Sequence, residues 1–190
     1  QDYATAVTAP DDPIKEGYTF GGWYSDAEYT TAYTFTTVSA EDITIYAKWN
    51  INSYTLQFVD TDGTVLQTTD YEYQADLSGV THPVATKEGY SFDGWYSDSE
   101  CTTTYTFTTI PAEDMTVYAK WTINQYTINF DTDNGSLLEF VTQNYNTNVT
   151  QPDDPVKEGY SFAGWYSDSE FTATYTFTTM PAEDITIYAK

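Results

Sequence analysis

Three short acidic runs are the part of this sequence best suited to bind a metal ion. Each has the pattern Ser-Asp-x-Glu, which places two carboxylates two positions apart. Calcium takes oxygen ligands from several Asp or Glu side chains, so these runs are weak candidates for calcium sites. A solvated loop is the commoner explanation, and we expect no dedicated metal site. The candidate carboxylates are Asp26, Glu28, Asp98, Glu100, Asp168 and Glu170.

A tyrosine stands two residues before each of the three aspartates, at Tyr24, Tyr96 and Tyr166. A ring face can stack on a sugar while a nearby carboxylate accepts protons from the sugar hydroxyls. These tyrosines are therefore candidates for a glycan-binding platform. The alternative, which we favour, is that each ring packs over its own thin sheet.

Groups that could carry out catalysis are scarce. His82 is the only histidine and Cys101 the only cysteine, and both lie in the middle third of the chain. Catalysis needs a positioned acid, base or nucleophile, often oriented by a partner. We therefore expect no enzyme activity and no cofactor. The single cysteine also excludes a disulfide within the chain.

Internal repetition organises the chain. Lys15–Asp26 returns with few changes as Lys87–Asp98 and as Lys157–Asp168, and Ala40–Trp49 returns at Ala112–Trp121 and Ala182–Lys190. We expect three domains: a truncated repeat at 1–49, a complete repeat at 50–121, and a repeat at 122–190 that lacks its final tryptophan. The segment 54–73 could belong to the repeat before it or after it. A repeat that is cut internally also predicts a segment of a longer protein.

Within a repeat the hydrophobic period is two. Ile43, Ile45, Ala47 and Trp49 alternate with polar residues, which predicts a half-buried strand in each copy. The segments 54–73 and 126–145 are predicted hairpins, because each contains a tight-turn signal, Asp-Gly or Asn-Gly. Further strands are predicted at the Gly-Tyr-x-Phe-x-Gly-Trp-Tyr segment and at Tyr33–Thr36, with their counterparts in the other copies. The expected fold is mainly β, with α+β content limited to short helical turns.

Large aromatic side chains must supply most of the core, because a repeat of this size buries little surface. The expected core residues are Trp23, Trp95, Trp165, Trp49 and Trp121. Only four residues separate Trp49 from Tyr54 and Trp121 from Tyr126, and none is Gly or Pro. We expect Ile51 and Ile123 to pack at these joints and the repeats to form an elongated, fairly stiff rod.

Charge narrows the range of partners. The chain carries 29 Asp and Glu against six lysines and no arginine, which gives a net charge of −23. Nucleic acid is excluded as a partner because no basic patch can be assembled. Membrane insertion is not expected either, because no run of 18 apolar residues is present.

The two repeated blocks closely resemble the Listeria-Bacteroides repeat family, which includes the internalin B-type B-repeats of bacterial surface proteins. The resemblance rests in the first copy on Gly17, Tyr18, Phe20, Gly22, Trp23, Tyr46, Ala47, Lys48 and Trp49. It implies a small β-grasp-like module, strung in tandem along an extracellular, wall-attached protein. The middle copy departs from the pattern, with Pro83-Val84-Ala85 where the other copies have Asp-Asp-Pro.

These observations favour a non-enzymatic stalk or spacer segment of an adhesin-like surface protein, with neighbouring repeats as its partners. The alternative is a module whose repeats themselves bind a host surface protein or glycan multivalently. A third hypothesis is self-association through an unpaired edge strand.

Overall fold

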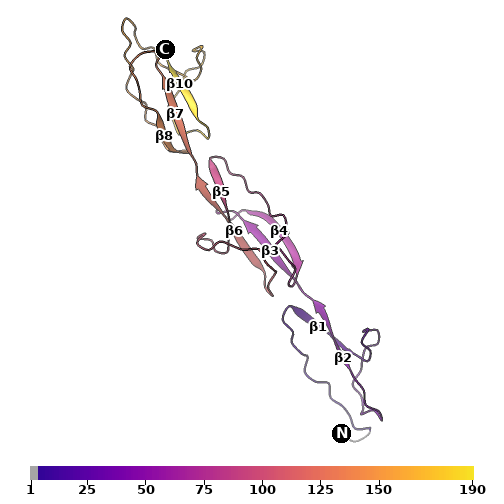
Figure 1. Ribbon diagram of the computed structural model, residues 1–190. Coiled ribbons are helices and arrows are strands. Elements are labelled where there is room, and N and C mark those ends of the chain that lie inside the picture. The colour runs from indigo at the N-terminus through magenta and orange to yellow at the C-terminus, as the bar shows by residue number, and fades with distance from the viewer. Residues whose placement is uncertain (1–3) are drawn as a thin grey trace. The chain divides into compact units, whose positions relative to one another are not determined.

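The computed structural model describes residues 4–190, and all its regular structure is β (Figure 1). No helix occurs among these residues, which confirms the predicted mainly β class. The chain divides into two compact units. One contains the residues up to Pro83 together with Trp95–Tyr118, and the other contains Val84–Gly94 together with Ala119–Lys190. The predicted division at 1–49, 50–121 and 122–190 stays a prediction.

A four-stranded sheet with the order β4-β3-β6-β5 is formed by the middle of the chain. Strands β3 (Ser53–Val59) and β4 (Val65–Glu72) form the predicted antiparallel hairpin. Strand β6 (Met115–Ile123) runs parallel to β3 and lies next to β5 (Tyr90–Tyr96). The segment 54–73 therefore pairs with the strand that follows it in sequence. Leu56, Phe58 and Val117 are fully or almost fully buried.

The last third of the chain repeats this arrangement as a sheet with the order β8-β7-β10-β9. Strands β7 (Gln125–Asp131) and β8 (Val141–Asn144) form the second predicted hairpin. Strand β10 (Ile185–Ala189) pairs in parallel with β7 and antiparallel with the short β9 (Trp165–Tyr166). The core of this sheet consists of Ile128, Val149, Trp165, Met180 and Ile187.

The first part of the chain holds a two-stranded sheet of β1 (Tyr18–Tyr24) and β2 (Tyr46–Ile51). The predicted strand was expected to begin at Ile43, and this is wrong, because Ile43 lies outside β2 and is 54% exposed. In the other two copies, the first half of this strand pairs in parallel with the first strand of a hairpin. In the middle copy, for example, Met115 pairs with Leu56. Among residues 4–190, the first copy shows no parallel partner for this strand.

The segment around Tyr33–Thr36 was also predicted as a strand, and this too is wrong. It is a loop held by isolated bridges, such as Tyr24 with Ala32, and its counterparts at Tyr105 and Tyr175 lie in similar loops. The alternation that suggested a strand instead directs rings inward, since Phe107 stacks on Phe58 at 5.9 Å between ring centroids. Alternation of apolar residues reports which side chains are buried, and it does not require a hydrogen-bonded ladder.

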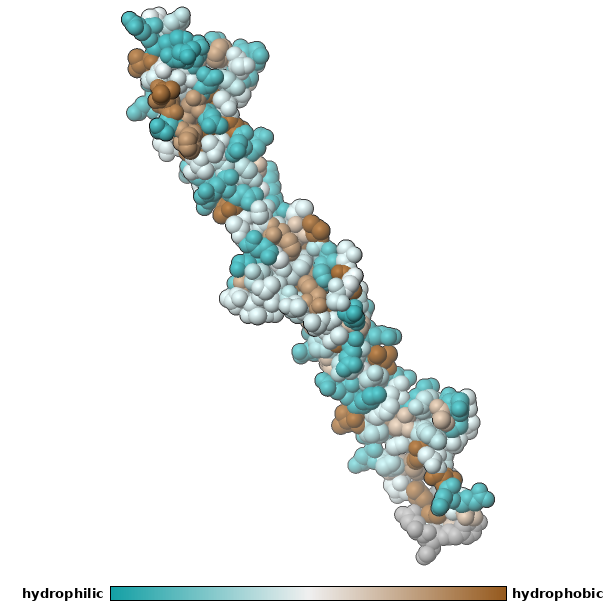
Figure 2. All heavy atoms as spheres, viewed as in Figure 1, coloured by the Kyte–Doolittle hydropathy of each residue, from teal (hydrophilic) through white to brown (hydrophobic). Residues whose placement is uncertain are grey.

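The predicted tryptophans differ in burial. Trp95 and Trp165 are buried, whereas Trp23, Trp49 and Trp121 are half-buried. Trp23 is more open than its two counterparts, and within the described residues its sheet contains only β1 and β2. On the face drawn in Figure 2, hydrophobic residues form only small, scattered groups among hydrophilic ones.

Candidate functional site

The three Ser-Asp-x-Glu runs form the same tight turn in each copy. In the middle copy the Asp98 carboxylate accepts hydrogen bonds from the backbone N–H groups of Thr102 and Thr103, at 2.9 and 2.8 Å, and from the Thr102 hydroxyl. Asp26 and Asp168 accept the equivalent backbone bonds in their own loops. The residue three positions after each aspartate adopts a positive φ, at Tyr29, Cys101 and Phe171. Each aspartate therefore closes its loop.

Hydrogen bonding sets the protonation of these aspartates. The backbone bond from Thr102 is the largest cause that lowers the pKa of Asp98 below its ordinary value of 3.8. The backbone bonds from Thr30 and Thr172 do the same for the pKa of Asp26 and Asp168. Donors aimed at a carboxylate favour its charged form. The turns therefore favour the ionised form of these aspartates.

These geometries bear on the calcium hypothesis. The aspartate oxygens already accept loop amides, while Glu28, Glu100 and Glu170 are exposed. Among residues 4–190 no group of three or more His, Cys, Asp or Glu side chains lies close enough to hold a metal ion. Calcium binding at these runs stays a prediction.

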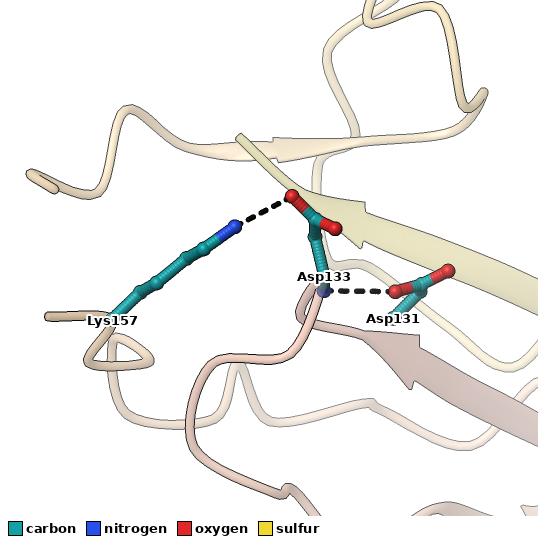
Figure 3. Close-up of polar contacts among 3 residues, drawn as sticks. All are labelled: Asp131, Asp133 and Lys157. Carbon is teal, nitrogen blue, oxygen red and sulfur yellow. Dashed lines mark hydrogen bonds and ion pairs between the residues drawn. The ribbon is translucent and has the colours of Figure 1, made fainter.

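Two other aspartates, in the turn that follows β7, take part in a hydrogen bond and an ion pair. The backbone N–H of Asp133 donates to Asp131 Oδ1 at 2.9 Å, and Lys157 Nζ donates to Asp133 Oδ2 at 2.6 Å (Figure 3). The Asp133 side chain is largely exposed, so this ion pair contributes little to stability. The ion pair between Lys157 and Asp133 connects the turn that follows β7 to the segment that precedes Tyr160.

Each candidate platform tyrosine is half-buried. Tyr24 and Tyr166 lie in similar clusters of a lysine and a second ring. Lys48 Nζ lies 5.2 Å from the centroid of Tyr24, and Lys190 Nζ lies 5.2 Å from that of Tyr166. A second ring meets two of these tyrosines edge-on, namely Tyr29 against Tyr24 and Phe171 against Tyr166. These contacts fit a cation–π pair over a ring packed on its own sheet. Glycan stacking on Tyr24, Tyr96 or Tyr166 stays a prediction.

His82 packs among aromatic rings. Its ring stacks on Phe107 with centroids 3.6 Å apart and lies 5.8 Å from Phe58. Its Nδ1 atom is buried without a hydrogen-bond partner. Burial lowers the pKa of His82 below its ordinary value of 6.5. These contacts make it a packing residue of the β4-β3-β6-β5 sheet.

This burial predicts that the middle sheet loses stability in mild acid. Below pH 6.5 the unfolded chain takes up a proton at His82 before the folded chain does, so stability falls as the pH drops from 6.5 to the lowered pKa. Amide hydrogen exchange in β3 and β6 should report this loss. In the variant H82L, the same amides should show no such pH dependence between pH 6.5 and 5.

The four-residue connections between copies contain hydrogen-bonded residues that the sequence analysis did not single out. Asn52 makes bonds in two directions: its backbone N–H donates to the Gly17 carbonyl at 2.9 Å, and its backbone carbonyl accepts from the Tyr73 N–H at 2.8 Å. Its side-chain oxygen accepts from the Thr19 hydroxyl at 2.6 Å. Ile51, expected to pack here, is 39% exposed. The sequence feature that could have identified these residues is the recurrence of Asn at the same place in both connections.

Asn124 makes the same set of bonds in the second connection. Its N–H donates to the Gly89 carbonyl, its carbonyl accepts from the Tyr145 N–H, and its side-chain oxygen accepts from the Ser91 hydroxyl. One asparagine thus links the start of a β1-type strand to the end of the following hairpin.

A tyrosine and a glycine complete each of these joints. The Tyr73 ring lies directly on Gly17, where a Cβ atom would be 2.1 Å from the ring, and Tyr145 lies on Gly89 in the same way at 2.0 Å. Both glycines have a φ of +75°. Glycine is therefore required twice over, for the backbone conformation and for the close approach. We call the Gly, Asn and Tyr together the asparagine joint.

Comparison with known proteins identifies the family of these repeats. The sequence pattern of the Listeria-Bacteroides repeat domain matches residues 1–48, 54–120 and 126–190. Two relatives come from Evansella cellulosilytica and carry the provisional names of a membrane protein and a Gly-rich membrane protein. Each is 42% identical over all of this chain, which spans 29% and 22% of their lengths. Internalin H of Listeria monocytogenes is 43% identical over 58% of this chain and 21% of its own length.

This chain therefore spans less than a third of the length of each of these relatives. Within residues 4–190, no helix has the length and hydropathy needed to cross a bilayer. The three matches cover nearly the whole sequence and coincide with the repeated blocks. The chain belongs to the Listeria-Bacteroides repeat domain family, and it is a repeat region like those of internalin-type surface proteins.

Proposed function

We propose that this chain is a non-enzymatic spacer segment of a bacterial surface protein. The asparagine joint is the observation that carries the proposal, because it recurs with nearly identical distances in both connections. A connection in which Asn52 or Asn124 makes these three hydrogen bonds, with a ring packed on glycine beside it, has little freedom to bend. Repeats joined in this way would hold a binding domain at a distance from the envelope.

Two further observations support the proposal. The relatives include an internalin and proteins named for the membrane, which fits an extracellular address and attachment to the cell wall through other parts of a longer protein. The net charge of −23 gives repeats that repel one another, which opposes collapse and aggregation.

Small-angle X-ray scattering of the full chain tests this function. We expect an elongated particle, and a compact globular profile would contradict the proposal. The double variant N52G/N124G should broaden the distribution of particle lengths, because glycine keeps the backbone bonds but loses the side-chain bonds and gains flexibility. The matched control is N134G, at a turn residue with a φ of +63° outside both joints, which should leave the profile unchanged.

A second candidate function is multivalent binding of a host protein or glycan. It is favoured by the recurrence of the same ring and lysine pair at Tyr24 with Lys48 and at Tyr166 with Lys190. Glycan arrays probed with the full chain separate the two functions, because a spacer gives no signal. A binder gives a signal that falls steeply in a variant with Tyr24, Tyr96 and Tyr166 all changed to alanine.

A further inference from the structure

Strand β4 is the longest edge strand among residues 4–190. It lies at the end of the β4-β3-β6-β5 order and is eight residues long (Figure 1). The corresponding edge strand in the last third of the chain, β8, has only four residues. At the opposite edge of the middle sheet, β5 is partly covered by its own loop, which forms a bridge between Tyr96 and Thr104. Strand β4 contains neither lysine nor proline, two residues that commonly block strand addition.

The backbone of β4 leaves hydrogen-bonding groups on its outer side. In an antiparallel pair, alternate residues direct both of their backbone groups toward the partner strand. The Tyr73 N–H donates to the Asn52 carbonyl at 2.8 Å, so in the regular part of the register the odd-numbered residues face β3. Thr68, Asp70 and Glu72 therefore direct their N–H groups outward. No other segment within residues 4–190 pairs with this side of β4.

Two of the side chains along this edge are acidic. Asp70 and Glu72 are exposed and lie on the same face of the strand, because they are two positions apart. One oxygen of Asp70 accepts a hydrogen bond from the Thr55 hydroxyl at 2.8 Å, and a carboxylate can accept several such bonds. A strand added in antiparallel pairing would place a side chain opposite each carboxylate, at about 5 Å between Cβ atoms. Opposite charges at these positions stabilise a sheet, so they should be lysine or arginine.

We propose that the outer edge of β4 binds an extended basic segment of another protein by strand addition. Backbone hydrogen bonds to Thr68, Asp70 and Glu72 form the pairing, and basic side chains at alternate positions of the segment face the two carboxylates. The partner is not a second copy of this chain. Its six lysines are scattered singly, and a second β4 would add two further carboxylates to the same face. The net charge of −23 attracts a basic segment from a distance.

This inference goes beyond the spacer function and does not use the candidate platform tyrosines. A spacer can carry a strand-addition site on its side, because the pairing occupies only the edge of one sheet. The spacer function is measured by scattering of the chain alone, whereas strand addition is measured with a peptide. Failure of one therefore leaves the other intact.

The test is titration of the full chain with an eight-residue peptide of alternating threonine and lysine, followed by amide hydrogen exchange. We expect the peptide to slow exchange of the Thr68 and Asp70 amides. The Thr142 amide, which faces outward in β8, should be unchanged. The same peptide with Nα-methylated lysines carries the same charge but cannot donate to β4, so it should bind roughly tenfold more weakly.

Two variants locate the site. T68P removes an outward N–H that takes no part in the pairing with β3, so the sheet should persist while affinity for the peptide falls roughly tenfold. T142P makes the same change on the outer side of β8 and should leave the affinity unchanged. The double variant D70N/E72Q keeps the shape of the edge but removes both charges, and it should weaken binding about fivefold.

Equal affinity for the methylated peptide would overturn the proposal, because charge alone would then hold the peptide. Unchanged exchange at Thr68 and Asp70 would overturn it as well, since the peptide would then lie elsewhere on the chain. Exchange of the β3 amides in T68P shows whether this variant still folds. If it does not, D70N/E72Q decides, and an affinity equal to that of the unchanged chain contradicts the assigned charge pairs.

Discussion

Replacing Trp165 with alanine is expected to reduce the local stability of the β8-β7-β10-β9 sheet by about 3–5 kcal/mol, the usual cost of removing a buried tryptophan. Trp165 is 4% exposed and lies at the centre of an aromatic cluster. Phe162 and Phe130 meet its ring at 5.3 and 5.4 Å, and Phe177 meets it at 6.3 Å. In a repeat with so small a core, no other residue can fill the cavity that remains.

Native-state hydrogen exchange of the Ile187 amide measures this loss, with the amides of β3 and β6 as an internal reference. Trp23 provides the control, because it occupies the corresponding place in the first copy but is half-buried, so W23A should cost clearly less. The variant W165F should cost under about 1.5 kcal/mol, because the indole N–H has no hydrogen-bond partner to lose. Equal losses for W165A and W23A would contradict this account of the core.

The elements that the sequence predicted well depend on local signals. Both hairpins were predicted from alternating residues that end in an Asp-Gly or Asn-Gly turn, and the structure confirms both strand pairings. In the second hairpin the tight Asn-Gly closure is wrong, because residues 132–140 separate β7 from β8. The family was evident from the repeated blocks around Gly17 and Trp49, and the match over all three copies confirms it.

The elements that were predicted wrongly depend on pairing with residues far away in sequence. Ile43 has the same alternation as Met115 and Ile185, but among residues 4–190 only Met115 and Ile185 have a parallel partner strand, so only those two copies form a strand at this position. The Tyr33–Thr36 loop alternates because its rings are buried by packing, without a neighbouring strand to pair with. A pattern in one segment cannot show whether its partner exists.

The asparagine joint could not be predicted for a related reason. Nothing in the short connection around Asn124 indicates that three of its bonding groups reach Gly89, Ser91 and Tyr145, which lie more than 20 residues away on either side. The positive φ of Gly89 and the ring above it become visible only when both segments are placed together.

Replacing Gly89 with alanine is expected to disrupt the second joint at a cost of about 2–4 kcal/mol. Roughly 1 kcal/mol comes from holding an L-residue at a φ of +75°, and about 1–3 kcal/mol comes from the overlap of the new methyl group with the Tyr145 ring. The Asn124 amide, which donates to the Gly89 carbonyl, should lose protection from hydrogen exchange by the corresponding factor.

Gly159 supplies the matched control within the same chain. It has nearly the same φ but no ring above it, so G159A should cost only the backbone share of about 1 kcal/mol. The difference between G89A and G159A therefore measures the packing of tyrosine on glycine. In the double variant G89A/Y145A the methyl group no longer meets the ring, so its cost should fall below the sum of the single costs. Strict additivity of the two would show that the ring and the glycine do not form a joint.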